Sequence, residues 1–508
     1  MLGFGRTRRD RRIAVCDLGS NSFRLVVFDA AGEYWRRTDE IYQPVRIGAG
    51  LAATGKLSDD GIERALATID VFHHFCEASG VDEVDAVATS AIRDASNAGT
   101  LIERSALPIR VLSREEEAYY GYLAAVNSTA LDHGAVLDIG GGSMQLISVN
   151  ERVAGQTGSW PLGAVRMTEK FELGEATASQ KQIKSLRNHV AKEIGDAKWL
   201  HAAGDHLVGI GGTIRNLATA AQRAGNLPEF GVQGFVLRRG VLAELIGRLA
   251  EIPAAERGRV PGIKPARADL ILAGAVVVDS VLEHGGFEAI EVTEAGLREG
   301  VFFARQIERD PPLFDNVRET SVRNLTALYP VEPEGHVEHV SKLALGLFDD
   351  LAAAKVHGGD KRERELLWAA CQLHDIGMTV AYDDHHKHSR YLILNAGLPG
   401  FSPREVALIA QAVRYHRKGM PGPGPFAKLM GKGDEQRLLR MATLLRLAED
   451  FERSRDGTVT STGVGVDNGS VTLALLSVDD ARVPRWAAGR ELELFKRAFE
   501  RELILTSG

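Results

Sequence analysis

The sequence predicts a duplicated α/β fold, followed by a mostly helical region and a small α+β segment. Three observations lead to this prediction. A strand, a small polar turn and a second strand at residues 13–30 recur, with a glycine-rich turn, at residues 135–149. Short apolar runs alternate with helical stretches up to about residue 305, which is typical of α/β domains. From residue 336 the apolar spacing becomes helical.

The first repeat is expected to begin with a hairpin, because two β-rich runs flank a small polar turn within residues 13–30. Ser58 is a suitable N-cap for a helix that extends to about residue 77. Strands are expected at residues 84–88 and 109–112, with a helix near 98–105 between them. We place this first domain at residues 13–133.

The second repeat is expected to start with strands at residues 135–139 and 144–149. A strand, glycine turn and helix follow across residues 207–220, and a strand leads into a helix across residues 290–305. We place this second domain at residues 134–308 and expect a cleft between the two halves.

Proline-rich punctuation around residues 309–335 marks a change of texture. The third domain, residues 320–455, is expected to be helical, with helices at residues 336–353, 363–372, 388–394, 403–415 and 435–453. The last segment, residues 456–508, is predicted to hold two strands, at residues 458–466 and 471–476, and a helix.

Composition excludes several classes of protein. The chain has 508 residues, 44% of them hydrophobic, and a net charge of −7. It contains no apolar run of the ~18 residues that a membrane span needs. Its three cysteines are widely spaced, which argues against a disulfide framework and favours a reducing, cytoplasmic compartment. The basic stretch at residues 5–12 lacks a following apolar segment, so we interpret it as a solvated tail rather than a signal peptide or a nucleic-acid arm. No membrane and no specific nucleic-acid partner are expected.

Three glycine turns point to phosphate binding. Asp17 precedes Gly19 and Ser20, Asp138 precedes the turn 140–143, and a third turn spans residues 209–213. Glycine lets backbone N–H groups approach a phosphate closely, and a carboxylate at a strand end can hold Mg²⁺. One such turn would be weak evidence, but the three together favour phosphate binding over purely structural turns.

The motifs at these turns resemble those of the Ppx/GppA family of exopolyphosphatases and guanosine pentaphosphate phosphatases, in the actin–Hsp70–sugar kinase superfamily. The resemblance rests on residues 15–23, 88–97, 113–122, 137–143, 209–214 and 294–300, and it continues through residues 413–418. It implies two actin-like (ribonuclease H-like) α/β domains, then a helical HD-like domain and a small α+β domain.

The resemblance also implies a function, which is Mg²⁺-dependent removal of terminal phosphate from inorganic polyphosphate and possible conversion of guanosine pentaphosphate to tetraphosphate. Glu117 would activate water, with Asp138 beside it as a second catalytic carboxylate. Asp17 and Asp138 would hold Mg²⁺. The implied phosphate-binding residues are Ser20, Asn21, Ser22, Arg24, Arg93, Gly140, Gly141, Gly142, Ser143, Gly211, Gly212 and Thr213.

The chain departs from the family pattern at two positions. Arg114 stands where the family commonly has glycine, and Met144-Gln145 stands where it often has Thr-Glu. Gln145 cannot bring a negative charge to Mg²⁺, although its amide oxygen can still be a neutral ligand. Outside these motifs, Arg257, Arg259, Lys264 and Arg267 form a loose basic group, for which a solvated face and a polyanion track both remain open.

The helical region is rich in histidine and resembles an HD-type domain. In that pattern, His339, His374, Asp375 and Glu449 would occupy the positions of a divalent-metal site. We favour the alternative from sequence, which is an HD-like fold without metal in which the basic histidine and lysine stretch guides polyphosphate.

Two other functions stay open. The phosphate turns also suit an ATP-dependent small-molecule kinase of the same superfamily, and Gln145 also suits a non-catalytic alarmone or polyphosphate sensor. The sequence does not distinguish polyphosphate from guanosine pentaphosphate. A homodimer is expected only because two-fold dimers are the commonest oligomers.

Overall fold

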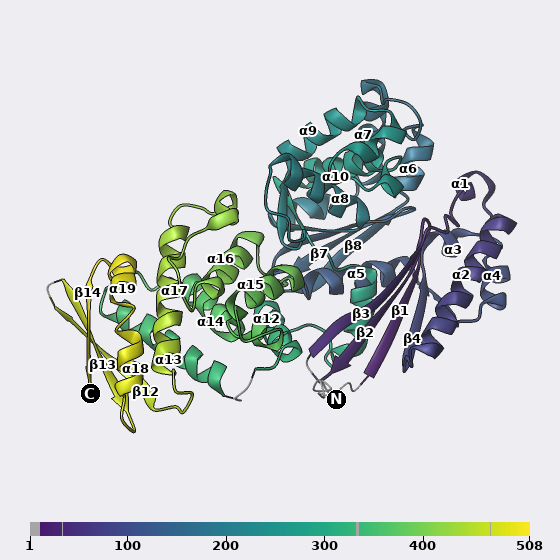
Figure 1. The fold of residues 1–508 in the computed structure, drawn as a ribbon. Coiled ribbons are helices and arrows are strands. Elements are labelled where there is room, and N and C mark those ends of the chain that lie inside the picture. The colour runs from purple at the N-terminus through teal and green to yellow at the C-terminus, as the bar shows by residue number, and fades with distance from the viewer. Residues whose placement is uncertain (1–10, 33, 332–334, 468, 508) are drawn as a thin grey trace. The chain divides into compact units, whose positions relative to one another are not determined.

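The computed structural model describes residues 11–32, 34–331, 335–467 and 469–507 (Figure 1). Most of the basic N-terminal stretch therefore lies outside the described residues. The chain divides into two compact units, residues 1–317 and 318–508, which we describe separately. Among the described residues, no helix combines the length and the apolar character needed to cross a membrane.

The first sheet of the N-terminal unit has the strand order β3-β2-β1-β4-β5. β1, β2 and β3 pair antiparallel, whereas β1, β4 and β5 pair parallel. Its strands are β1 (Arg11–Leu18), β2 (Phe23–Ala31), β3 (Tyr34–Gln43), β4 (Glu83–Ala88) and β5 (Ile109–Val111). The helices of this half are α1 (Leu51–Thr54), α2 (Asp59–Ala78), α3 (Ser90–Asp94), α4 (Ala98–Arg104) and α5 (Arg114–Val126).

The expected hairpin, the strands β4 and β5 and the helices α2 and α4 are confirmed. Ser58 is the N-cap of α2, and its hydroxyl accepts a hydrogen bond from the Gly61 N–H. β3 was not expected from the sequence. Most of its residues are exposed, so it carries no apolar alternation that would mark a half-buried strand.

The second sheet repeats this arrangement, with the order β10-β11-β9-β6-β7-β8. Read from its other end, β8-β7-β6-β9-β11 matches β3-β2-β1-β4-β5 in order and direction, and β10 is an added antiparallel edge. The expected duplication is therefore present in the topology. The strands are β6 (Gly134–Ile139), β7 (Met144–Asn150), β8 (Val153–Trp160), β9 (Leu207–Ile210), β10 (Phe235–Arg238) and β11 (Ala289–Val292).

Helices α6 to α10 pack around α10, in which nearly every residue is buried. α11 packs against α5, and Gly300 allows the close approach because a Cβ there would collide with the Tyr120 carbonyl oxygen. The helices and 3₁₀ turns of this half are α6 (Ala164–Lys170), α7 (Gln180–Glu193), η1 (Lys198–Ala202), α8 (Gly212–Ala224), α9 (Arg239–Ala250), η2 (Ala254–Arg259), η3 (Pro265–Arg267), α10 (Ile271–Gly285) and α11 (Leu297–Gln306).

The C-terminal unit is mostly helical, and each helix expected between residues 336 and 453 is confirmed. Its helices and 3₁₀ turns are α12 (Val317–Leu328), α13 (His336–Ala353), α14 (Lys361–Leu373), η4 (Ile376–Thr379), α15 (His385–Ala396), α16 (Pro403–Arg414), η5 (Gly424–Leu429) and α17 (Asp434–Phe451). A small sheet follows with the order β12-β13-β14 and two short helices, formed by β12 (Val459–Asp467), β13 (Ser470–Ser477), α18 (Arg482–Ala488), α19 (Leu492–Phe499) and β14 (Glu502–Ser507).

Candidate functional site

A cleft of about 150 Å³ lies in the N-terminal unit, lined by residues from both of its halves. We call it the N-terminal cleft. Its lining combines carboxylates, arginines and glycine turns, with little apolar surface. The polar and glycine residues that line it are Asp17, Gly19, Ser20, Asn21, Ser22, Arg24, Thr89, Ser90, Glu117, Asp138, Gly140, Gly141, Ser143, Gly211, Gly212, Arg215, Arg267, Gly296 and Arg298.

Two equivalent turns contribute to the lining, one from each repeat. β1 carries Asp17 near its end, and β6 carries Asp138 at the same place. The Gly19 N–H then donates to the Ser22 carbonyl oxygen at 3.2 Å, and the Gly140 N–H donates to the Ser143 carbonyl oxygen at 3.0 Å. The duplicated turns therefore present two similar sets of backbone and side-chain donors to one space.

The third turn joins β9 to α8 and needs glycine for two reasons. Gly211 has a φ of 109°, which L side chains rarely adopt, and a Cβ there would lie 2.6 Å from the Ile139 carbonyl oxygen. The turn brings the N-terminus of α8 to the cleft, and Gly296 brings that of α11. Unpaired N–H groups at helix N-termini favour bound anions.

Three carboxylates face the cleft, and their charges oppose one another. Burial raises the pKa of Asp138 to about 7, and the neighbouring carboxylates Glu117 and Asp17 contribute to that shift. Burial also raises the pKa of Asp17, against the opposing effect of Arg298 and Arg24. A divalent cation would relieve this repulsion, and carboxylate oxygens are the ligands that Mg²⁺ accepts.

Glu117 is held by hydrogen bonds at the start of α5, which begins with a capping box between Ser113 and Glu116. Arg93 Nη1 donates to Glu117 Oε2 at 2.8 Å, and the Ser143 hydroxyl donates to Oε1 at 3.4 Å. Burial raises the pKa of Glu117, although the Arg93 hydrogen bond opposes this rise. The carboxylate is therefore oriented and is more basic than an exposed glutamate.

Four arginines line the same cleft, namely Arg24, Arg215, Arg267 and Arg298. Burial and the nearby Arg298 charge lower the pKa of Arg215 to about 10. Burial and Arg298 also lower the pKa of Arg24, although Arg24 is 3.0 Å from Glu40. Arg298 is 6% exposed, and its Nε and Nη1 have no hydrogen-bond partner among the described residues. Such a concentration of positive charge is suited to an oxyanion with several charges.

Most of the phosphate-binding and metal residues named from sequence line the cleft, but Arg93, Gly142, Thr213 and Gln145 are not in its described lining. Arg93 lies behind Glu117. Gln145 is 1% exposed and its Nε2 donates to the Ser143 hydroxyl at 2.9 Å, so it supports the turn from behind. Neither the roles of these residues nor Mg²⁺ binding is tested by this geometry.

Sequence reasoning missed Thr89, Ser90, Arg215 and Arg298 as lining residues. Arg298 lies inside the motif at residues 294–300 and Arg215 directly follows the third turn, so an unpaired arginine in a motif was the available signal. Members of the loose basic group separate: Arg267 lines the cleft, whereas Arg257 is fully buried and donates to backbone carbonyls such as that of Leu173.

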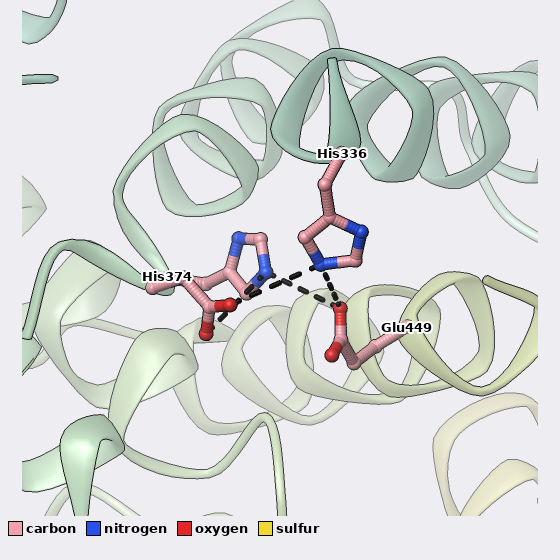
Figure 2. Close-up of side chains that lie close together, drawn as sticks. His336, His374 and Glu449 are labelled. Carbon is pink, nitrogen blue, oxygen red and sulfur yellow. Dashed lines mark ion pairs between the residues drawn. The ribbon is translucent and has the colours of Figure 1, made fainter. Parts of the chain in front are cut away.

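A second cluster of titratable side chains lies in the C-terminal unit. His336, His374, Asp375 and Glu449 place ligand atoms within 4.8 Å of one another (Figure 2). His336 Nε2 lies 3.2 Å from Glu449 Oε2, and His374 Nε2 lies 3.3 Å from the same oxygen. The sequence prediction chose the wrong histidine of α13. His339 instead contacts the Val459 carbonyl oxygen through Nε2 at 2.8 Å, because three residues along a helix turn the side chain away from the cluster.

Charges within this second cluster compensate one another. Burial would lower the pKa of His374, but Asp375 and Glu449 outweigh it and raise the pKa to about 9. Burial would raise the pKa of Glu449, but His336 and His374 outweigh it and lower the pKa well below its ordinary value. Burial, together with His374, lowers the pKa of His416 to about 3.

Comparison with known proteins agrees with the topology. Residues 27–307 match the Ppx/GppA phosphatase family, and residues 317–482 match domain III of Ppx/GppA phosphatases. A crystal structure of the Aquifex aeolicus Ppx/GppA family member is similar at 30% identity and a TM-score of 0.50, over 57% of this chain and 96% of that one. A second structure, of the Aquifex aeolicus PPX-GPPA enzyme, is similar at 31% identity and a TM-score of 0.51, over 57% of this chain and 98% of that one.

The fold is also shared with an exopolyphosphatase from Cytophaga hutchinsonii. That similarity has 24% identity and a TM-score of 0.54, over 58% of this chain and 98% of that one. At this identity the likeness concerns the fold alone.

Proposed function

Because the chain belongs to the Ppx/GppA phosphatase family, we propose that it is an exopolyphosphatase that hydrolyses the terminal phosphoanhydride bond of inorganic polyphosphate. Guanosine pentaphosphate, which ends in the same kind of bond, is the second candidate substrate. Exopolyphosphatase is the printed description of the similar Cytophaga hutchinsonii protein.

One observation carries the proposal, namely that three buried carboxylates and four arginines line one small cleft. The arginines and the glycine turns suit the charged end of a phosphate chain, and the carboxylates suit a cation and a base. A volume of about 150 Å³ has room for the end of a chain and not for its length, which favours removal of terminal phosphates.

Mg²⁺ is the cation we propose for the carboxylate side of the cleft. Asp17 and Asp138 would hold it, because the raised pKa of Asp138 records a charge repulsion that a cation would offset. When bound, Mg²⁺ would neutralise charge on the phosphate oxygens. Gln145 is assigned an indirect role through Ser143, since it lies behind that residue.

Glu117 is the proposed general base. Its carboxylate would accept a proton from water as the water oxygen attacks the terminal phosphorus, and the bond to the bridging oxygen breaks. Arg93 would hold the carboxylate in position through their 2.8 Å hydrogen bond. The arginines of the cleft and the backbone N–H groups of the glycine turns would stabilise charge on the transferred group and on the departing chain.

The test uses the full-length protein, polyphosphate of defined length and Mg²⁺, with no nucleotide present. We expect orthophosphate to accumulate while the chain shortens one unit at a time, and guanosine pentaphosphate is assayed in parallel. A requirement for ATP and an acceptor would instead favour the kinase alternative. Tight polyphosphate binding without phosphate release would favour the sensor.

A further inference from the structure

The histidines of the C-terminal unit are fixed in one tautomer by the backbone. Nδ1 of His374 lies 2.6 Å from the Cys371 carbonyl oxygen, Nδ1 of His385 lies 2.9 Å from that of Tyr382, and Nδ1 of His416 lies 2.7 Å from that of Val413. A carbonyl oxygen only accepts, so each Nδ1 carries the proton. In the neutral ring, Nε2 then presents a lone pair, which is the arrangement that metal-ligating histidines use.

These Nε2 atoms converge on Asp375. Asp375 Oδ1 lies 3.0 Å from His385 Nε2, 3.6 Å from His416 Nε2 and 3.7 Å from His374 Nε2. His385 and His416 also bring their Nε2 atoms within 3.1 Å of each other. Two neutral rings in this tautomer would repel at that distance, whereas a shared cation between them would be bound by both.

His336 adds an independent indication. The residue is 3% exposed, and its Nδ1 has no hydrogen-bond partner among the described residues. Its Nε2 points to the carboxylates of Glu449, at 3.2 Å, and Asp375, at 3.9 Å. A buried imidazole without a hydrogen-bonded partner is costly, and a metal ion would compensate it.

We propose that the C-terminal unit holds a dinuclear centre of divalent transition-metal ions bridged by Asp375. One ion would be bound by His336, His374, Asp375 and Glu449, and the second by Asp375, His385 and His416. Metal bonds of about 2.0–2.2 Å place neighbouring ligand atoms about 3.0–3.4 Å apart, which is close to the spacings found here. Asp375 has four lone-pair sites, so it can bridge both ions while Oδ2 also accepts the 2.9 Å hydrogen bond from Arg455 Nη2.

Local packing brings the two ligand groups together. Gly377, just after Asp375, lies so close to α15 that a Cβ there would be 2.3 Å from the His385 carbonyl oxygen. The Ser389 hydroxyl joins the same elements, accepting from the Gly377 N–H at 2.9 Å and donating to the His374 carbonyl oxygen at 2.6 Å. The ligands therefore come from a rigid junction.

The donor set selects the metal class. Four imidazoles with two carboxylates favour ions such as Zn²⁺, Mn²⁺ or Fe²⁺ over Mg²⁺ and Ca²⁺, which prefer oxygen donors throughout. The centre thus differs in chemistry from the all-oxygen carboxylate group of the N-terminal cleft.

The second ion has only three protein ligands, and the cluster opens to a cavity of about 440 Å³ in the same unit. His416 and Glu449 line that cavity together with Arg417, Lys418 and Arg453. An oxyanion such as a phosphate group could complete the coordination of the second ion while those cations hold its remaining charge.

The test measures metal in the full-length protein after loading with Mn²⁺, Zn²⁺ or Co²⁺ and gel filtration. We expect about two equivalents per chain in wild type, about one in the His385→Gln/His416→Gln double variant, and loss of the first ion in His336→Gln. His339→Gln is the matched control, one turn along α13, and should retain two equivalents. Glu449→Gln, whose side chain is 15% exposed, replaces His336→Gln if the latter does not fold.

Inorganic phosphate is the probe of the open coordination position. It should change the visible absorption spectrum of the Co²⁺-loaded protein, and Arg453→Met should weaken that response while leaving the Co²⁺ content at two equivalents. A wild-type content below one equivalent, or equal loss in His339→Gln, would overturn the centre. One equivalent that the double variant retains would overturn its dinuclear form. A phosphate-insensitive spectrum would overturn the oxyanion position. None of these measurements depends on polyphosphate hydrolysis.

Discussion

The N-terminal cleft and the histidine cluster of the C-terminal unit both bury charged groups, but they satisfy them differently. In the cleft, Asp138 is close enough to Glu117 and Asp17 to have its pKa raised to about 7, and Arg298 keeps two unpartnered nitrogens among the described residues. In the cluster, Asp375 and Glu449 face histidines, and the opposite charges lower the pKa of Glu449.

This difference separates two kinds of site. The cleft repels its own charges, so it is adapted to ligands that bring countercharge, such as a cation with a polyanion. The cluster is already compensated within the protein and is fixed by backbone hydrogen bonds, so it is adapted to hold an ion permanently. The predictions below test the cleft side of this comparison, from the largest expected effect to the smallest.

Glu117→Gln should lower the turnover of phosphate release by about 10²–10⁴-fold, because it removes the proposed base while keeping the shape of the side chain. Polyphosphate binding, measured by a filter or fluorescence assay, should persist. Glu116→Gln is the matched control one position earlier, since glutamine also satisfies the capping box. Near-normal turnover in Glu117→Gln would remove Glu117 from catalysis.

Arg298→Met should raise KM for polyphosphate about 10–100-fold, because one buried hydrogen bond to a charged group contributes about 1.5–3 kcal/mol. Tm without ligand should stay the same or rise, since the variant removes an unpartnered buried cation. Arg305→Met, further along α11 and paired with Asp85, is the control. An unchanged KM, or a KM change that merely follows a fall in Tm, contradicts a direct role for Arg298 in binding.

Asp138→Asn should change how stability depends on pH. The native pKa of about 7 lies above the ordinary value of 3.8, so wild type loses stability as pH rises from about 4 to 7 and keeps that penalty above 7. The variant lacks this penalty and should be more stable at pH 8 by up to about 4 kcal/mol, with no difference at pH 3. Urea unfolding at both pH values measures it. Equal stability of the two proteins at pH 8 would mean that the cleft carboxylates do not repel one another.

Gln145→Glu should have the smallest effect, a change in the Mg²⁺ midpoint of activity of about tenfold at most, because residue 145 acts through the Ser143 hydroxyl. The added carboxylate cannot donate to that hydroxyl. A Mg²⁺ titration of activity measures the shift, with Gln156→Glu on the exposed part of β8 as the control. A much larger tightening would make residue 145 a direct ligand.

The sequence predicted the duplication well because each repeat carries its own Asp-plus-glycine turn on a buried strand. It did not predict β3, β8 or β14. β3 and β8 are largely exposed, and β14 follows a short helix at the end of the chain, so their sequences lack the alternation that marks a strand.

The sites were predictable to different degrees. Backbone turns announce themselves through glycine, whereas Arg215 and Arg298 reach the cleft through the fold and carry no local signal beyond their place next to motifs. In α13, His336 shares the spacing of the buried Val340, Leu343 and Leu347, and His339 does not. That periodicity was the signal that could have identified the correct histidine.

The most direct test of the central claim, that the cleft hydrolyses terminal phosphate with water as acceptor, is polyphosphate cleavage by the full-length protein in ¹⁸O-labelled water with Mg²⁺. Attack by water on the terminal phosphorus predicts one solvent oxygen in each released orthophosphate, measured by mass spectrometry, and no release in Glu117→Gln above background. Orthophosphate without the label, or no release until another acceptor is added, would contradict the account.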